Sequence, residues 1–231
     1  MSLFNGAMSH NHSAHEETTS LDEMDPSLAD GFHVIYDREV PMEIRHHYTG
    51  DESISTGTLE AIKVKMLLRG EDDSPHSIRL EMSSENDLFF HFSHGIDAQD
   101  FHLVQEQQKL VVDYAEYPNV LIRMLNACIR EPHQHLAIFV IKDQEEARLD
   151  FIQNMEYKFV ELVSCNCQRS SEEVIQKQIT YRYNSTKQRL TVMQSRLHEI
   201  NNLVKMKNPS LLLQLQKSSV NMSSSNPSGR R

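Results

Sequence analysis

The chain alternates apolar and polar residues in short segments, and this period of two predicts β-strands. Ile78, Leu80 and Met82, for example, alternate with polar residues, as a half-buried strand requires. The segments predicted as strands are residues 34–36, 40–46, 62–68, 78–82, 110–112, 136–141, 148–153 and 158–164, with one more after a turn at 83–87. Because the last three follow one another through short polar turns, we expect a small antiparallel, β-rich head domain.

Two short helices are predicted within this series of strands. Asp97 can cap a helix that carries Phe101 and Val104, because its side-chain oxygen can accept otherwise unpaired backbone N–H groups. Pro118 suits the first turn of a second helix, which should end at Glu131. One face of that helix is apolar and consists of Leu121, Met124, Leu125 and Cys128.

A third pattern, with a period near 3.5 residues, runs from residue 171 to residue 207 and predicts a short parallel coiled coil. Heptad positions a and d fall on Gln176, Ile179, Tyr183, Thr186, Leu190, Met193, Leu197, Ile200, Val204 and Lys207. The predicted seam consists of the apolar members Ile179, Tyr183, Leu190, Met193, Leu197, Ile200 and Val204. A single amphipathic helix that packs back on the head is the alternative.

Composition divides the chain into four parts. Residues 1–31 are rich in Ser, His, Asp and Glu, lack apolar periodicity, and are predicted to be a disordered leader. Residues 32–168 form the predicted head, residues 169–208 the predicted coiled-coil helix, and residues 209–231 a flexible Ser-rich tail. We therefore expect one globular domain with two appendages.

Charge and cysteine content narrow the class of protein. The net charge of -10 and the isoelectric point near 5.7 argue against a nucleic-acid partner, which needs a concentrated basic surface. Three cysteines indicate a reducing compartment without a disulfide framework. The sequence shows no apolar run long enough for a membrane span, so we expect a cytoplasmic protein that does not bind membranes.

Few residues of the sequence are candidates for a metal site, a cofactor site or a catalytic site. The pairs His133 with His135 and Cys165 with Cys167 are spaced too closely for a usual structural zinc site. Seven scattered glycines offer no phosphate-binding loop. We therefore expect no metal, no cofactor, no small-molecule substrate and no enzymatic activity, and a metal-dependent enzyme is the disfavoured alternative.

The most specific signal lies in residues 79–130, where five features follow in a fixed order. They are an acidic residue near a Phe-Phe pair, an acidic-Phe pair that opens a helix, a hydrophobic residue, an Asp-aromatic pair, and an aromatic-Pro pair. The residues are Asp87, Phe89, Phe90, Asp100, Phe101, Asp113, Tyr114, Tyr117 and Pro118. Most are expected in the core, including Phe89, Phe90 and Phe101, together with Val111 and Leu125. This order resembles the PISA motif of the spindle assembly abnormal protein six family, the centriolar cartwheel proteins.

The resemblance implies an α+β fold, with an antiparallel β-sandwich or barrel-like head followed by a coiled coil. In the family, coils pair the chains, and heads of neighbouring dimers dock into the rings that form the cartwheel hub. Docking uses an aromatic residue on the loop between the last two strands, within an Asn-x-Phe-Lys pattern. Here the loop spans residues 154–158 and places Tyr157 at that position, with Phe159 as a second candidate because the spacing is one residue longer, and with Met155 beside them.

The resemblance thus implies a structural self-assembly protein of the centriole, the basal body or the base of a flagellum. Its partners would be itself and other cytoskeletal or centriolar proteins. The coil is far shorter than the family's, which indicates either a truncated chain or the shorter paralogue of the family. That paralogue would act as an adaptor at the flagellar basal plate or in the apical cytoskeleton, without forming rings.

Overall fold

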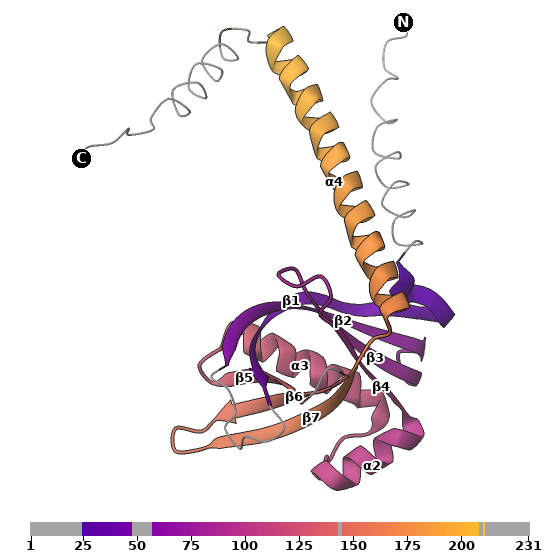
Figure 1. Cartoon of the computed structure of the whole chain (residues 1–231), viewed down its shortest axis with the longest axis vertical. Helices are drawn as coiled ribbons and strands as arrows, with labels where there is room; N and C mark the ends of the chain where they lie inside the picture. Colours follow the sequence, from indigo (N-terminus) through magenta and orange to yellow (C-terminus); the bar gives the residue numbers. More distant parts are fainter. Residues whose placement is uncertain (1–24, 48–56, 143–144, 208–209, 211–231) are drawn as a thin grey trace, which may run out of the picture. The chain divides into compact units, whose positions relative to one another are not determined.

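The computed structural model describes residues 25–47, 57–142, 145–207 and 210. Within these residues, seven strands close into a barrel in the order β1-β2-β3-β4-β7-β6-β5 (Figure 1). The strands are β1 (Phe32–His46), β2 (Thr58–Glu71), β3 (Ser74–Ser84), β4 (His91–Asp97), β5 (His135–Ile141), β6 (Glu146–Asn154) and β7 (Phe159–Arg169). The chain divides into two compact units, Met1–Tyr181 and Arg182–Arg231, and the barrel belongs to the first.

The expected barrel-like head with short helices is confirmed, although its sheet is not wholly antiparallel. Strand β1 pairs with β5 in parallel, residues 43–46 against residues 138–141, while the other neighbouring pairs of the described barrel are antiparallel. A closed ring with an odd number of strands cannot alternate direction throughout, so one parallel pair is required. The meanders β1 to β4 and β5 to β7 meet there.

Two predicted strand assignments differ from the structure. Residues 34–36 and 40–46 belong to one strand, β1, which has a register shift between Val34 and Tyr36. Residues 110–112 form no strand, because Lys109 takes up a left-handed conformation (φ 55°) and directs the chain into a loop. The Gln105 side chain holds this loop by donating to the Val112 carbonyl at 2.9 Å.

Both predicted head helices are confirmed as α2 (Ala98–Gln108) and α3 (Tyr117–Arg130). Helix α3 buries the face predicted for it, with Leu121, Leu125 and Cys128 in the core and Met124 half-buried. Figure 1 shows α3 beside β1 and β5, the strands that it contacts. The interior of the barrel and this helix face therefore form one hydrophobic core.

Asp97 caps α2 as predicted, and its loss should lower the stability of the head. Its Oδ1 accepts from the backbone N–H groups of Gln99 at 2.8 Å and Asp100 at 2.9 Å. We expect Asp97→Ala to lower the free energy of unfolding by about 1 kcal/mol, because both donors lose their partner. Urea unfolding checks this against Asp73→Ala, a change in the exposed β2–β3 turn; equal midpoints for the two variants would contradict it.

The amino-terminal boundary of the head differs from the prediction. Residues 25–31 fall within the predicted disordered leader, yet Pro26–Gly31 form the 3-10 segment η1, which Asp25 caps. Asp25 and Ser27 are buried, and they bond to side chains of β2 and β3. Buried polar contacts hold this segment in place. The prediction of disorder considered only its lack of apolar periodicity. The rest of the predicted leader, and the tail from residue 211, lie outside the described residues.

The predicted coiled-coil segment is a helix, α4 (Glu172–Lys207). Its first turns, through Tyr181, belong to the same unit as the barrel. Ile175 and Gln178 are the buried residues of these turns. Among the described residues, no helix is long and apolar enough to cross a membrane.

Candidate assembly surfaces

The first candidate surface is the turn between β6 and β7, at residues 155–158. Asn154 pairs with Phe159 at the end of the ladder, and the Asn154 backbone N–H donates to the Gln134 carbonyl at 2.8 Å. The Met155 N–H donates to the Lys158 carbonyl at 2.9 Å, and Tyr157 donates back to Met155. Glu156 has a left-handed φ of 52°, which is uncommon for a residue other than glycine. The turn is thus held by its own backbone hydrogen bonds.

The turn and the first residue of β7 carry three apolar side chains directed to solvent. Tyr157 is 94% exposed, Phe159 65% and Met155 51%. Further along the same hairpin, beyond the register shift between Phe151 and Ile152, Phe151 and Val163 are buried in the barrel. The structure therefore brings together all three residues that the sequence predicted for head-to-head contact. A cluster of exposed apolar side chains on a rigid turn is typical of an interaction surface.

The second candidate surface is the predicted seam of α4. Side chains along it are more than half exposed, namely Tyr183, Leu190, Met193, Leu197 and Ile200, while Ile179 and Val204 are partly covered. In the first turns, the buried residues Ile175 and Gln178 lie one position before Gln176 and Ile179, which occupy heptad positions a and d. The seam is thus a separate face of the helix, and one copy of the chain leaves most of it uncovered.

The ordered motif in residues 79–130 divides into core and surface. Phe101, Tyr117 and Pro118 are buried, and the rings of Phe101 and Tyr117 lie 4.9 Å apart between centroids. Phe90 is half-buried against the rings of Phe92 and Phe139. Tyr114 is partly buried, and its hydroxyl donates to the Ile96 carbonyl at 2.9 Å. These aromatic residues stabilise the head, as expected.

Phe89 and Val111 correct the expectation that the motif is core. Phe89 is 63% exposed, and Val111 is 98% exposed. The Asp87 carboxylate accepts the Phe89 backbone N–H at 2.9 Å, and the Asp87 carbonyl accepts that of Phe90 at 3.1 Å. This turn sends the two adjacent phenylalanines in different directions, so only Phe90 reaches the core.

The remaining acidic residues of the motif, Asp100 and Asp113, are exposed. Asp113 stands before the short 3-10 segment η2 (Tyr114–Glu116), and its carbonyl accepts the N–H groups of Glu116 and Tyr117. Asp100 lies in the first turn of α2, where a negative charge is favourable. Among the acidic side chains of the motif, that of Asp87 holds a turn, whereas Asp113 makes no side-chain capping bond.

The cysteines considered as metal ligands are buried in the core of the head. Cys165 and Cys167 are buried thiols, and Cys165 lies 3.6 Å from the Tyr117 hydroxyl. Burial raises the pKa of the Cys165 thiol to about 12 and that of Cys128 to about 11, so both remain protonated at neutral pH. Within the described ranges, no group of three or more His, Cys, Asp or Glu residues could hold a metal ion.

Sequence reasoning missed the buried polar residues Asp25, Ser27 and Gln178. One local signal was available, because Asp25 followed by Pro26 is the usual pairing of a capping residue and a first helical residue. Gln178 carries no such signal, since its partner lies 151 positions away in the sequence.

Comparison with known proteins gives consistent matches. The family model described as the centriolar protein SAS N-terminal domain matches residues 34–167. A spindle assembly abnormal protein 6 homolog of Danio rerio is 22% identical over 128 residues, which are 52% of this chain and 20% of that protein. The homolog of Gallus gallus is 21% identical over 109 residues, 47% of this chain and 16% of the relative. The chain thus spans about a fifth of the length of these relatives.

Solved structures of low sequence identity share the fold. An N-terminal fragment of Leishmania SAS-6 with parts of its coiled coil superposes with a TM-score of 0.64 at 16% identity, covering 78% of this chain and 98% of the fragment. A fragment of Drosophila melanogaster Sas-6, dimerised via its coiled-coil domain, gives 0.64 at 12% identity and covers 86% of this chain and 94% of the fragment. A head followed by a helix is common to all three chains.

Proposed function

Because the chain belongs to the SAS-6 family of centriolar proteins, as the match over residues 34–167 of its 231 establishes, we propose that it is a structural self-assembly protein of the centriole. Two copies pair through the seam of α4. Heads of different dimers then dock through the β6–β7 turn. The proposal extends to basal bodies and the base of flagella, and it involves no catalytic step.

The observation that carries the proposal is the exposure of Tyr157 on an ordered turn. A side chain that is 94% exposed contributes nothing to the core, yet hydrogen bonds within residues 154–158 hold its backbone in place. Aromatic anchors that enter a pocket on a partner dominate many interfaces, and pre-ordered anchors lose less entropy on binding. Tyr157 has the geometry of such an anchor, with Met155 and Phe159 at its sides.

Pairing through α4 is supported by the uncovered seam and by the relatives. Fragments of Caenorhabditis elegans and Drosophila melanogaster SAS-6 have been solved as coiled-coil dimers. An apolar stripe at heptad spacing gains stability when a second helix covers it. In this chain, Leu190, Leu197 and Ile200 provide such a stripe, and each is more than half exposed.

The two contacts act together in the proposed assembly. One inserted aromatic contributes a few kcal/mol, so isolated heads should associate with a Kd of about 10 µM or weaker. A coil that joins two heads makes each dimer bivalent, and a second docking contact then forms within an assembly already held together. Closed rings are favoured over single weak contacts for this reason.

Concentration dependence tests the proposal on the unmodified chain. We expect sedimentation velocity to show a dimer at about 1 µM and larger species from about 100 µM upward, since the coil is the stronger contact. Electron microscopy of the concentrated sample should show curved or closed assemblies. A mass that stays at the dimer across this range would argue against head docking and for a dimeric adaptor. A monomer throughout would contradict both contacts.

A further inference from the structure

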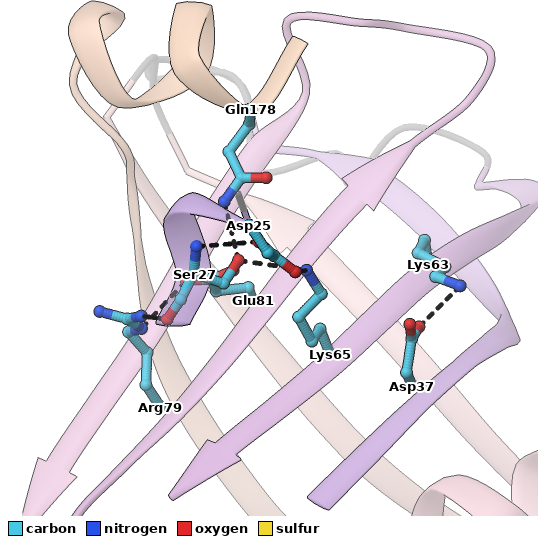
Figure 2. A network of polar contacts seen from close by, with 8 residues as sticks. All are labelled: Asp25, Ser27, Asp37, Lys63, Lys65, Arg79, Glu81 and Gln178. Atoms are coloured by element: carbon cyan, nitrogen blue, oxygen red, sulfur yellow. Dashed lines mark hydrogen bonds and ion pairs between the residues drawn. The ribbon is translucent and has the colours of Figure 1, made fainter. Parts of the chain in front are cut away.

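A buried polar network joins four segments of the chain. Its members are Asp25 and Ser27 of the amino-terminal segment, Lys65 on β2, Arg79 and Glu81 on β3, and Gln178 on α4 (Figure 2). Figure 2 shows these side chains converging on Ser27, while the nearby pair Lys63 and Asp37 stands apart. Ser27, Glu81 and Gln178 are each less than 9% exposed.

The hydroxyl of Ser27 is the centre of the network, and its bonding capacity is full. It donates to Glu81 Oε2 at 2.6 Å. It accepts from Gln178 Nε2 at 2.8 Å and from Lys65 Nζ at 3.2 Å. A hydroxyl offers one donor and two acceptor sites, so each is used. Because Ser27 is 1% exposed, there is no room for a larger side chain to take its place.

One ion pair fixes the amino-terminal segment to the outer face of the sheet, and a second lies beside it within β3. Lys65 Nζ lies 2.6 Å from Asp25 Oδ2, and Arg79 Nε lies 2.9 Å from Glu81 Oε1. The Arg79 guanidinium also donates to the Ser27 carbonyl, and it lies 4.2 Å from the centroid of the Phe32 ring. Two cations thus face two carboxylates, and the network is neutral overall when all four groups are charged.

Lys65 links the network to α4 a second time. Its ammonium lies 5.7 Å from the centroid of the Tyr181 ring, within the range of a cation–π contact. Gln178 and Tyr181 are three residues apart and therefore lie on neighbouring parts of the helix surface. The first turns of α4 are thus held by Gln178, by Tyr181 and by the buried side chain of Ile175.

We propose that residues 25–31 act as a strap that seats the first turns of α4, residues 172–181, on strands β2 and β3, with Ser27 as the shared link. Strap and helix then hold each other in place: when either leaves, the other loses its buried partner. Asp25, Ser27 and Gln178 all lie outside residues 34–167, the part that matches the family domain.

The physical reason is the cost of an unpaired buried polar group. If the helix turn leaves, an acceptor site of Ser27 and the ammonium of Lys65 each lose a partner. If the strap leaves, Gln178, Lys65 and Glu81 lose theirs while still near the sheet. Buried polar groups without partners are costly. Release of the strap therefore makes release of the first turns of α4 easier, and the reverse holds as well. Such coupling is reciprocal, and both segments should respond to a change in either.

Hydrogen exchange on the full chain tests the coupling through Gln178→Glu. The change removes the amide donor and places a carboxylate next to Ser27 and Glu81. We expect amide exchange to become about tenfold faster in residues 175–181 and also in residues 27–31, because both segments open more often. The matched control is Gln188→Glu, which makes the same change at an exposed position of α4. Exchange within β6 serves as the internal reference.

A second variant, Ser27→Ala, tests the same link by a change in the strap. Its control is Ser74→Ala, at the exposed first residue of β3. It should accelerate exchange in residues 175–181, although the substitution lies in another segment. Faster exchange confined to the mutated segment would overturn the coupling. Unchanged exchange in both segments would overturn the strap itself.

The strap would also contribute to assembly, because it holds the start of the helix through which two heads are joined. This part of the inference rests on the proposed function. The exchange test does not rest on it. Gln178 occupies heptad position c, outside the predicted seam, so the dimer should form with unchanged affinity in Gln178→Glu. Measured at about 1 µM and again where larger species form, the exchange result separates a failed strap from a failed assembly.

Discussion

A chain that carries both Leu190→Asp and Leu197→Asp is expected to be monomeric. Both leucines occupy position a of the predicted seam and are more than half exposed in one copy. Covering a leucine side chain contributes about 1.5–3 kcal/mol, and a dimer contains each leucine twice. Aspartate removes this gain and adds like charges that face each other. The dimer should therefore weaken by at least about 1000-fold.

Sedimentation equilibrium at about 10 µM measures this loss, with dimeric wild type as the reference. The matched control carries Gln188→Asp and Ser195→Asp, which are exposed residues at position f, each two positions before one of the leucines. It introduces the same residues on the same helix and should remain dimeric. If the seam variant stays dimeric, the helix does not pair through this face. If the control dissociates as well, the effect comes from charge or loss of helix.

Tyr157→Glu is expected to abolish head docking and leave the coil dimer intact. Removal of a central aromatic anchor costs about 2–4 kcal/mol, which weakens association by about 30-fold to 1000-fold. Because the Tyr157 side chain is 94% exposed, its loss should not alter the stability of the head. At about 100 µM, where we expect wild type to form larger species, the variant should sediment as a dimer.

Two companion variants sharpen this result. Gln168→Glu makes the same change of one negative charge at an exposed position on β7, away from the turn, and should assemble like wild type. Tyr157→Phe removes only the hydroxyl. It should retain docking, or strengthen it if the docked ring leaves the hydroxyl without a partner. If Tyr157→Glu assembles normally, Tyr157 is not the anchor, and Phe159→Glu becomes the next test.

The two experiments report on different contacts. Loss of the coil should leave heads that associate weakly and pairwise, whereas loss of head docking should leave stable dimers. The double defect should give monomers at every concentration. Tyr157 and Leu190 belong to separate compact units of the chain. A substitution at either residue should therefore weaken only the contact that this residue makes.

Local chemistry in the sequence was enough to predict much of the fold. Asp97 caps α2, because capping depends on residues within one turn. Leu121, Leu125 and Cys128 share the buried face of α3, because helical spacing places them there. The exposed turn with Tyr157 was predicted from the resemblance, and the exposed side chains of α4 from the heptad repeat.

The sequence by itself thus predicted most of the strands and the helices α2, α3 and α4, since each follows from a period or a cap within a few residues. The seam of α4 stays a prediction. Tertiary structure decided which of two adjacent aromatics is core. Phe90 packs on Phe139, a residue of a distant strand, while Phe89 faces solvent. It also decided that residues 25–31 belong to the head. Ser27 is ordered by Lys65, Glu81 and Gln178, and no local pattern records partners that only the closed barrel and the start of α4 bring together.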